Sequence, residues 1–202
     1  MLENKLGITS QVELANEEER ITKLKALELF DTKKIDEFEI GTFKGLSNIH
    51  EFLFDDVYSF AGKMRKDNIA KGNFRFASCM YLEDVLNKID NMPQNNFENI
   101  IKKYVEMNIA HPFREGNGRS TRIWLDMILK KELNKVIDWS KVNKEDYLLA
   151  MERSPVKDLE IRLLLQNALT DKINDRQVFM KGIDMSYQYE GYNTYSIEEL
   201  DN

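Results

Sequence analysis

The most chemically informative part of the sequence is the run HPFREGNGRSTR, which occupies residues 111–122. Glycines on both sides of Asn117 remove Cβ atoms, so main-chain N–H groups can approach an anion closely and the chain can take positive φ. The next residues, 119–133, contain neither Pro nor Gly and follow a helical pattern. The turn therefore stands at a helix N-terminus, where unpaired N–H groups and the helix dipole favour a phosphate.

Charged and titratable side chains around this turn suit a nucleotide polyphosphate. Arg119 and Arg122 share one face of the first helical turn, where the dipole disfavours cations unless an anion is bound in front of them. Glu115 would be repelled by that anion unless a hard cation such as Mg²⁺ lies between them. His111, just upstream, can take a proton from an attacking hydroxyl. Together these residue types predict transfer chemistry at a phosphate, with His111 as the general base.

Each part alone also has an ordinary structural interpretation. A GNG run is typical of a simple turn, and a pair of arginines is typical of a solvated helix face. A histidine before a proline can cap the C-terminus of a helix. The combination of all these features favours the functional interpretation. His50, by contrast, lies on an apolar helix and is expected to be structural.

The run 111–122 resembles the full signature of the Fic family, H-x-F-x-(D/E)-G-N-G-R-x-x-R, with every fixed position filled. The resemblance implies an all-α fold, a Fic-type helical bundle with a small β-hairpin flap over the active site. It implies protein adenylyltransferase activity, in which AMP passes from ATP to a Ser, Thr or Tyr hydroxyl of a target protein and pyrophosphate is released. ATP would be the substrate and Mg²⁺ the metal, with Ca²⁺ and Mn²⁺ as alternatives.

The resemblance also implies a role for each residue of the signature. His111 would be the catalytic base, Phe113 would anchor the loop with a buried ring, and Glu115 would hold the metal against the α- and β-phosphates. An anion hole for the transferring phosphate would be formed by Asn117 with the amides of Gly116 and Gly118. The β- and γ-phosphates would be bound by Arg119 and Arg122.

Residues 69–76, IAKGNFRF, resemble the hairpin flap that overhangs the Fic active site. Alternating residues around a Lys71-Gly72-Asn73 turn signal are compatible with two brief strands. An exposed strand edge here could pair with an extended segment of the target. The expected target-binding residues are Ile69, Lys71, Gly72 and Phe76. The alternative interpretation is an ordinary loop between two helices.

Residues 186–191, SYQYEG, match the (S/T)-x-x-x-E-(G/N) inhibitory motif of Fic proteins, in the class that carries it at the C-terminal end. The motif residues are Ser186, Glu190 and Gly191, and in that class the glutamate pairs with the second motif arginine, here Arg122. This pairing would occupy the charge partner of the γ-phosphate and inhibit transfer. The alternative is a frayed helix end, with Ser186 as a cap and Gly191 as a terminator.

Glu190 also suggests a reverse reaction. A carboxylate near an AMP-modified side chain could orient or deprotonate a water molecule and so remove AMP from the target (deAMPylation). His111 would then protonate the leaving hydroxyl, because acid and base exchange roles when a step is reversed.

Composition and charge narrow the remaining possibilities. A chain of 202 residues with one cysteine, Cys79, fits a single Fic domain over residues 1–202. Its core would span about 40–170 and its C-terminal inhibitory segment about 182–192. A net charge of −6 without a basic patch argues against direct nucleic-acid binding. Neither a bilayer-spanning stretch nor a signal sequence after Met1 is evident, so no membrane contact and a cytoplasmic location are expected.

The expected partner is a target protein that docks along the flap, and a homo-oligomer is also considered. Self-modification would use the hydroxyls that are nearest in sequence, those of Ser186, Tyr187, Tyr189 and Tyr192. Two other functions stay open: a regulatory ATP-binding module without transfer activity, and a Fic-type transferase of another phosphate-containing group. The complete signature favours AMP transfer, because a pure binder has no use for a base.

Apolar spacing predicts helices along most of the chain. The first is expected to open near Asn16, where three glutamates suit a first turn, and to end near Phe30. A second starts between Gly41 and Gly45. Others are expected over 80–89, 97–110, 119–133, 144–153 and 157–169, and the segment from Asn174 would pack the inhibitory motif across the site. The helix over 119–133 is apolar on nearly every side, which predicts a central buried helix.

Overall fold

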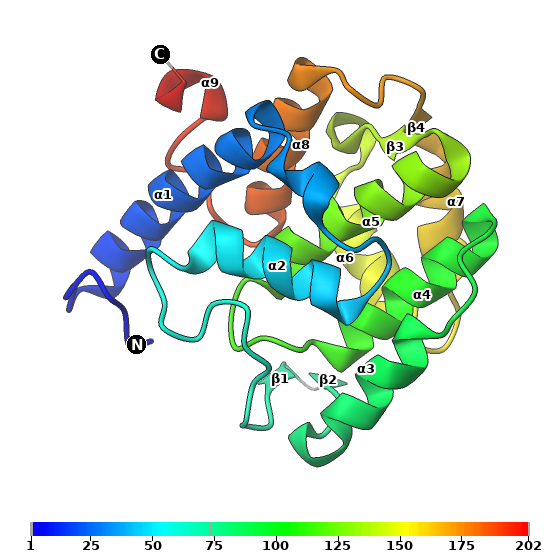
Figure 1. Ribbon diagram of the computed structural model, residues 1–202, viewed down its shortest axis with the longest axis horizontal. Helices are drawn as coiled ribbons and strands as arrows, with labels where there is room; N and C mark the ends of the chain where they lie inside the picture. The colour runs from blue at the N-terminus through cyan, green and yellow to red at the C-terminus, as the bar shows by residue number, and fades with distance from the viewer. Residues whose placement is uncertain (1, 73, 202) are drawn as a thin grey trace.

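The computed structural model describes residues 2–72 and 74–201 and places most of them in α-helices (Figure 1). The α-helices are α1 (Gln11–Asp31), α2 (Phe43–Phe54), α3 (Leu82–Asp90), α4 (Phe97–Ala110), α5 (Asn117–Leu133), α6 (Lys144–Arg153), α7 (Leu159–Asn167), α8 (Arg176–Tyr189) and α9 (Ile197–Leu200). The 3₁₀ turns are η1 (Lys34–Glu37), η2 (Cys79–Tyr81) and η3 (Trp139–Lys141). Two antiparallel pairs of strands join β1 (Ala70–Lys71) to β2 (Phe74–Arg75) and β3 (Val136–Ile137) to β4 (Leu169–Thr170). The expected helical fold with a small hairpin is confirmed.

Helix α5 forms the centre of the bundle and packs against α2, α4 and α8. Its residues Trp124, Leu125, Ile128 and Leu129 are all fully buried. Burying side chains of this size stabilises the fold by about 1.5–3 kcal/mol each. The one polar atom of the Trp124 ring is satisfied because Nε1 donates to the Thr42 carbonyl at 3.0 Å. The predicted central helix is therefore present, and it fixes the position of every element around it.

The joint between α4 and α5 carries the sequence signature and is shaped by two residues with positive φ. Helix α4 begins after Asn96, whose side chain accepts from the Asn99 N–H at 2.9 Å. It ends at His111, which has φ 48°, and Pro112 follows. Gly116 has φ 76° and starts α5, which begins two residues before the expected start. The signature loop is therefore a short connection held at both ends by core helices.

Helix α1 begins at Gln11, so the expected start near Asn16 is wrong. Ser10 caps the helix by accepting from the Glu13 N–H at 3.4 Å. The acidic run that suggested a first turn lies well inside the helix, and two of its members, Glu18 and Glu19, are buried. These two carboxylates pair with cations inside the protein, so their charge serves tertiary contacts and not the helix dipole.

The C-terminal segment lies along α1, as the blue and red ribbons at one side of Figure 1 show. Lys23 of α1 donates to the Tyr195 carbonyl at 2.5 Å and pairs with Asp184 of α8 at 2.8 Å. Glu19 pairs with the same lysine at 3.1 Å and accepts from the Thr194 N–H at 3.0 Å. These charged groups connect the two ends of the chain.

The flap is a β-hairpin with two residues in each strand, in which Ala70 pairs with Arg75 and Lys71 pairs with Phe74. The Ala77 N–H donates to the Ile109 carbonyl at 3.0 Å, which ties the end of the flap to α4. Gly72 lies in the turn. Asn73, the third residue of the expected turn signal, lies outside the described residues.

The second pair of strands, β3 and β4, was not predicted. Leu169, expected at the end of a helix, pairs with Ile137 instead. Helix α7 stops at Asn167 and the strand begins two residues later. A two-residue strand is too short for a period-2 pattern, so the sequence offers no signal for it.

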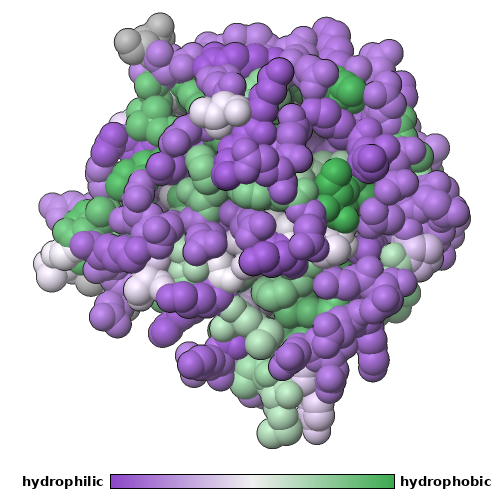
Figure 2. Space-filling view, viewed as in Figure 1, coloured by the Kyte–Doolittle hydropathy of each residue, from purple (hydrophilic) through white to green (hydrophobic). Residues whose placement is uncertain are grey.

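In the described part of the chain, no helix is both long enough and apolar enough to cross a membrane. Figure 2 shows that hydrophilic side chains cover most of the visible face and that apolar groups are scattered among them. The surface therefore agrees with the charged composition of the chain.

The buried Lys23 tests how much the contact between α1 and the C-terminal segment stabilises the fold. Lys23→Met keeps the length of the side chain but leaves the buried Glu19 carboxylate without its cation. We expect the free energy of unfolding in urea to fall by about 3–5 kcal/mol. Lys25→Met, which removes a more exposed lysine paired with Glu28, is the control and should cost at most about 1 kcal/mol. Equal losses in the two variants would contradict the prediction.

Candidate active site

The loop between α4 and α5 is anchored by aromatic packing and by one histidine. The Phe113 ring is fully buried and stacks on the His50 ring, with 3.9 Å between the ring centroids. His50 Nδ1 accepts from the Gly62 N–H at 2.9 Å, so Nε2 carries the proton and donates to the Glu115 carbonyl at 2.8 Å. Burial lowers the pKa of His50 to about 3, which keeps the ring neutral and preserves this tautomer. His50 is therefore a structural residue that holds the loop between α4 and α5 in place through Phe113 and the Glu115 carbonyl.

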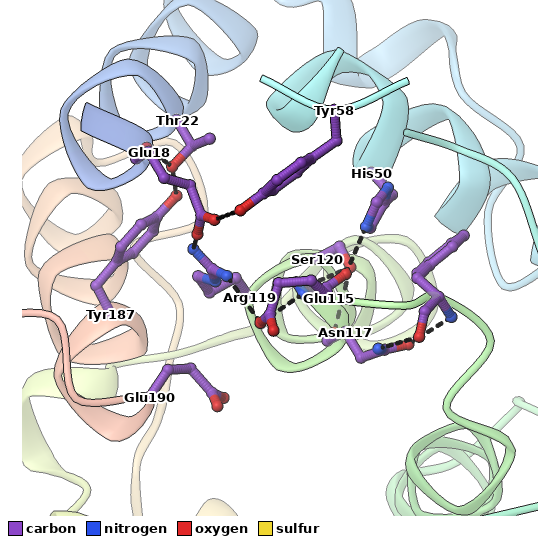
Figure 3. Close-up of polar contacts among 12 residues, drawn as sticks. Glu18, Thr22, His50, Tyr58, Glu115, Asn117, Arg119, Ser120, Tyr187 and Glu190 are labelled. Carbon is purple, nitrogen blue, oxygen red and sulfur yellow. Dashed lines mark hydrogen bonds and ion pairs between the residues drawn. The ribbon is translucent and has the colours of Figure 1, made fainter. Parts of the chain in front are cut away.

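The side chain of Asn117 stabilises the loop by two hydrogen bonds to the backbone of Phe113. Its Oδ1 accepts from the Phe113 N–H, and its Nδ2 donates to the Phe113 carbonyl, both at 2.8 Å. Both the oxygen and the nitrogen of the Asn117 side chain are thus bonded to the backbone of the loop (Figure 3). An anion at the start of α5 would therefore meet the backbone N–H groups of the first helical turn, which have no partner within the helix.

Glycine is required at position 116 for two reasons. Its φ of 76° disfavours residues with a Cβ atom, and a Cβ placed there would lie 2.5 Å from the Phe54 ring. The backbone can reverse at this point only because the side chain is absent. This reversal turns the N-terminus of α5 toward the same space as His111.

His111 presents one ring nitrogen as a free base. Its left-handed backbone conformation ends α4, and its ring stacks on Phe76 of the flap with 3.7 Å between centroids. Nδ1 lies 3.2 Å from the Asn108 carbonyl, to which only an N–H can donate, so the neutral ring keeps its lone pair on Nε2. Burial, with help from Lys71 and Arg65, lowers the pKa of His111 to about 4. The ring is therefore neutral at physiological pH and can accept a proton.

Arg65 holds His111 in place by binding the backbone carbonyl of His111. Its Nε donates to the His111 carbonyl at 2.8 Å, and its own N–H donates to the Pro112 carbonyl at 2.8 Å. The same guanidinium contacts the carbonyls of Ala77 and Ala110. One buried cation thus connects the flap, the end of α4 and the base.

Arg119 is buried and ion-paired on two sides. Its Nη1 donates to Glu18 of α1, and its Nη2 lies 3.1 Å from Glu115 Oε1 (Figure 3). Its guanidinium carbon lies 4.9 Å from the centre of the Phe54 ring and 4.6 Å from that of Tyr192. The residue lines the cleft, but its position is fixed by its neighbours.

Arg122 is held by the last turn of α8. Its Nε donates to Ser186 Oγ at 2.7 Å, and its Nη2 donates to the Ser186 carbonyl at 2.9 Å. The same Nη2 lies 2.8 Å from Glu190 Oε1, and Nη1 lies 3.2 Å from the Tyr147 hydroxyl. Every nitrogen of this guanidinium has a partner in the protein.

Glu190 occupies an anion position at the start of α5. A Cβ placed on Gly118 would lie 2.2 Å from Glu190 Oε1, so the carboxylate rests directly on the first helical turn. Burial alone would raise the pKa of Glu190, but the Arg122 charge and hydrogen bond outweigh it and lower the pKa to about 2. Lys71 of the flap lies 3.9 Å from Oε2. Gly191 follows, and its N–H donates to the Gln188 carbonyl at 3.0 Å.

These groups surround one cleft of about 910 Å³. The flap contributes Ile69, Lys71, Gly72 and Phe76, and the signature contributes His111, Glu115, Gly116, Asn117, Gly118, Arg119 and Arg122. Glu190 and Tyr192 close one side, and Tyr147, Leu148 and Met151 form a more apolar part of the wall. The structure therefore brings the flap, the signature and Glu190 into one site. Neither Phe113 nor Ser186 lines the cleft. Phe113 is buried beneath it, and Ser186 contacts Arg122, which does line it.

Glu115 is the residue that fits a metal ion. Its side chain is 40% exposed, and its Oε1 accepts from the Gly116 N–H at 3.0 Å. The described residues contain no cluster of three or more His, Cys, Asp or Glu that could hold an ion by themselves. Mg²⁺ commonly binds one or two carboxylates together with substrate phosphates, and a single exposed carboxylate beside a phosphate position suits that arrangement.

The hydroxyls that were considered for self-modification differ in access. Tyr187 is buried and donates to Thr22 Oγ1 at 2.6 Å, and Tyr189 is buried and donates to the Val142 carbonyl at 2.8 Å. Ser186 is buried against Arg122. Of these four residues, Tyr192 alone lines the cleft.

Sequence reasoning missed several residues of the site. Tyr147 contacts Arg122 from α6, and Glu18 contacts Arg119 from α1. Glu18 stands in an acidic run that was interpreted as a first turn, and its charged neighbours in the sequence give no sign that it is buried. Tyr147 stands among charged residues, and nothing nearby in the sequence marks it.

A family model described as the Fic/DOC family matches residues 42–129. The chain is 30% identical over 171 residues to the probable protein adenylyltransferase y4lH of Sinorhizobium fredii, a match that covers 79% of this chain and 85% of that protein. It is 32% identical over 196 residues to the protein adenylyltransferase VbhT of Bartonella schoenbuchensis, which covers 90% of this chain. The match spans 40% of the length of VbhT.

Solved structures share the fold at low identity. The FIC domain of Bep8 from Bartonella sp. 1-1C has a TM-score of 0.72 at 18% identity, covering 86% of this chain and 92% of that chain. The BepC protein of Bartonella tribocorum, solved with bound AMPPNP, has a TM-score of 0.67 at 19% identity, covering 84% of this chain and 92% of that chain.

The two histidines of the chain allow a direct test of the site's electrostatics. We expect the ring signals in an NMR titration to give pKa values of about 4 for His111 and about 3 for His50, because burial disfavours both charged forms. The unfolded chain takes up these protons at a higher pH, near 6.5, so stability should be lost as pH falls below that value. His111→Ala assigns the signals and serves as the control. Titration of either ring near pH 6.5 would contradict the prediction.

Proposed function

Because this chain belongs to the Fic/DOC family, we propose that it is a protein adenylyltransferase that transfers AMP from ATP to a Ser, Thr or Tyr hydroxyl of a target protein. The observation that carries the proposal is a neutral histidine with a free Nε2 beside a helix N-terminus in one cleft. A protein that only binds ATP needs the helix N-terminus but has no use for the base.

In the proposed reaction His111 takes the proton of the target hydroxyl, and the hydroxyl oxygen attacks the α-phosphorus of ATP. A new oxygen–phosphorus bond forms, the bond from the α-phosphorus to the bridging oxygen breaks, and pyrophosphate leaves. Charge on the α-phosphate is stabilised by the backbone N–H groups of the first turn of α5. Such transfer depends on positioning and charge more than on a protein nucleophile.

Glu115 would hold Mg²⁺, or Ca²⁺ or Mn²⁺, against the α- and β-phosphates. When bound, the ion would neutralise phosphate charge and orient the triphosphate. The partly exposed carboxylate and its fixed Oε1 support this assignment. Arg119 and Arg122 would bind the β- and γ-phosphates.

We further propose that Glu190 inhibits the enzyme. Its carboxylate takes the Arg122 Nη2 donor at 2.8 Å and rests on Gly118, so the γ-phosphate would lose both a cation and space. Residues 182–192 would be the inhibitory segment of a single Fic domain, and about 40–170 would be its catalytic core. Release of Glu190 would then switch the enzyme on.

The target protein would dock along the flap. Phe76 stacks on His111, so a segment paired with the hairpin edge would bring its hydroxyl to the base. Use of ATP as donor places the reaction in a compartment that contains ATP, which we take to be the cytoplasm.

Removing the inhibitory carboxylate should activate the enzyme. With ATP and Mg²⁺, we expect Glu190→Gly to transfer labelled AMP to proteins of a bacterial lysate at least about tenfold faster than wild type, because one charge-assisted hydrogen bond is worth about 1.5–3 kcal/mol. Adding His111→Ala should lower the rate by about 10²–10⁴-fold. Intact-mass spectrometry and label incorporation measure both effects.

Gln188→Gly is the matched control, because it weakens the same helix at an exposed position and leaves the carboxylate in place. Its rate should equal that of wild type. If none of the variants transfers AMP while ATP still binds, the chain is a nucleotide-binding module or uses another donor.

Glu190 and His111 line the same cleft, and the negative charge of Glu190 partly offsets the burial that lowers the pKa of His111. This arrangement supports a reverse reaction in which Glu190 orients a water molecule and accepts its proton. The water oxygen bonds to the phosphorus, the bond from the phosphorus to the target oxygen breaks, and a protonated His111 gives its proton to that oxygen. We expect wild type to release AMP from a protein that Glu190→Gly has modified, measured by chromatography of free AMP. Glu190→Gly and His111→Ala should release none. Equal release by Glu190→Gly would assign the water to another group.

A further inference from the structure

Helix α1 lies outside the segment 42–129 that matches the family, yet it contributes a carboxylate that contacts a residue of the site from behind the cleft. Glu18 is 1% exposed. It accepts hydrogen bonds from Arg119 Nη1 and from the Tyr58 hydroxyl, and Figure 3 shows it between these two groups. A carboxylate this deeply buried is costly unless a cation and hydrogen-bond donors compensate it. Both kinds of partner are present, and the cation is a residue of the signature.

The position of Arg119 explains why it needs a partner of this kind. It stands in the first turn of α5, where the helix dipole disfavours a cation. Arg122 lies one turn away and repels it. Three aromatic rings, those of Phe54, Tyr187 and Tyr192, surround the guanidinium at 4.6–5.2 Å, so water cannot solvate the charge. A fixed carboxylate supplies the compensation that water would otherwise give.

The geometry also orients the guanidinium. Nη1 is directed to Glu18, away from Glu115, and Nη2 is directed to Glu115 Oε1 at 3.1 Å. Glu115 is partly exposed in the cleft, so Nη2 is the nitrogen on the side of the phosphate position. Because a guanidinium is planar, holding Nη1 fixes where Nη2 points.

We infer that Glu18 is a positioning residue of the nucleotide site: it holds Arg119 so that Nη2 faces the β- and γ-phosphates of ATP. The inference rests on the proposed function only in taking Arg119 as a ligand of those phosphates. Glu18 contacts no substrate and acts through Arg119.

Glu18 and Glu190 then have different tasks at neighbouring arginines. Glu190 competes with phosphate for Arg122, and its side chain is 23% exposed at the end of α8. Glu18 binds the opposite side of Arg119 from the cleft and stays in place when nucleotide enters. Removal of Glu190 should therefore increase activity, and removal of Glu18 should decrease nucleotide affinity.

The test compares nucleotides that differ in the phosphates Arg119 would contact. Glu18→Ala and Glu18→Gln are made in the Glu190→Gly chain, and calorimetry measures Kd for ATP, ADP and AMP with Mg²⁺. We expect Glu18→Ala to weaken ATP and ADP binding about tenfold while AMP binding changes less than about twofold, because AMP lacks the phosphates concerned. Glu18→Gln keeps an acceptor oxygen for Arg119 but loses the negative charge, so it should recover only part of the loss and still weaken ATP and ADP binding more than AMP binding. Glu17→Ala, at the adjacent position and paired with Arg20 near the surface, is the control and should match the parent.

A purely structural role would appear as a lower melting temperature with ATP, ADP and AMP affinities all unchanged, or all reduced by the same factor, and either result overturns the inference. If Glu18→Ala does not fold, Glu18→Gln decides: weaker ATP binding with unchanged AMP binding supports positioning, and equal effects on both overturn it. AMP transfer by Glu190→Gly is measured in parallel. If Glu190→Gly transfers AMP but Glu18→Ala shows no selective loss of ATP and ADP binding, the role of Glu18 is refuted and the proposed function stands. If Glu18→Ala shows the selective loss but Glu190→Gly transfers no AMP, the role of Glu18 stands and the proposed function is refuted.

Discussion

Two arginines buried at the N-terminus of one helix are the constraint around which this protein is built. The dipole of α5 disfavours both Arg119 and Arg122, and neither side chain reaches enough water to be solvated. Each must therefore meet a carboxylate within the protein, and each does, at Glu18 and Glu190. These carboxylates come from the first and the last long helices of the chain, so compensating the two charges brings its two ends to one site.

The contact between α1 and the C-terminal segment has a consequence for the position of Glu190. The buried Lys23 and Glu19, with the partly exposed Asp184, form a set of charges that connects α1 with α8 and with the backbone beyond Gly191. Tyr187 adds a hydrogen bond to Thr22 at 2.6 Å. The last turn of α8 is thus attached on both sides of Glu190, and the position of the carboxylate over Gly118 depends on α1 as much as on α8.

The local sequence predicts the signature loop but not the distant residues that contact it. His111, Gly116 and the boundaries of α4 could be predicted because a left-handed residue, a proline and a glycine leave local signals. The start of α1 was misplaced because the same carboxylates that suit a first turn also suit buried ion pairs. Glu18 and Arg119 are 101 positions apart, and no spacing rule connects them. The side chain of Asn117 is likewise used by Phe113, which only the folded loop reveals.

Hydrogen bonds from the end of α8 explain why the Arg122 side chain should keep its position when Glu190 is removed. The Glu190 N–H bonds to the Tyr187 carbonyl at 3.1 Å, which leaves the Ser186 carbonyl free for Arg122 Nη2 at 2.9 Å. Ser186 Oγ holds Nε of the same side chain at 2.7 Å. Carbonyls in the last turn of a helix carry partial negative charge and favour a cation. Arg122 is therefore positioned by Ser186 and neutralised by Glu190, so under the proposed function a phosphate would replace the carboxylate without moving the arginine.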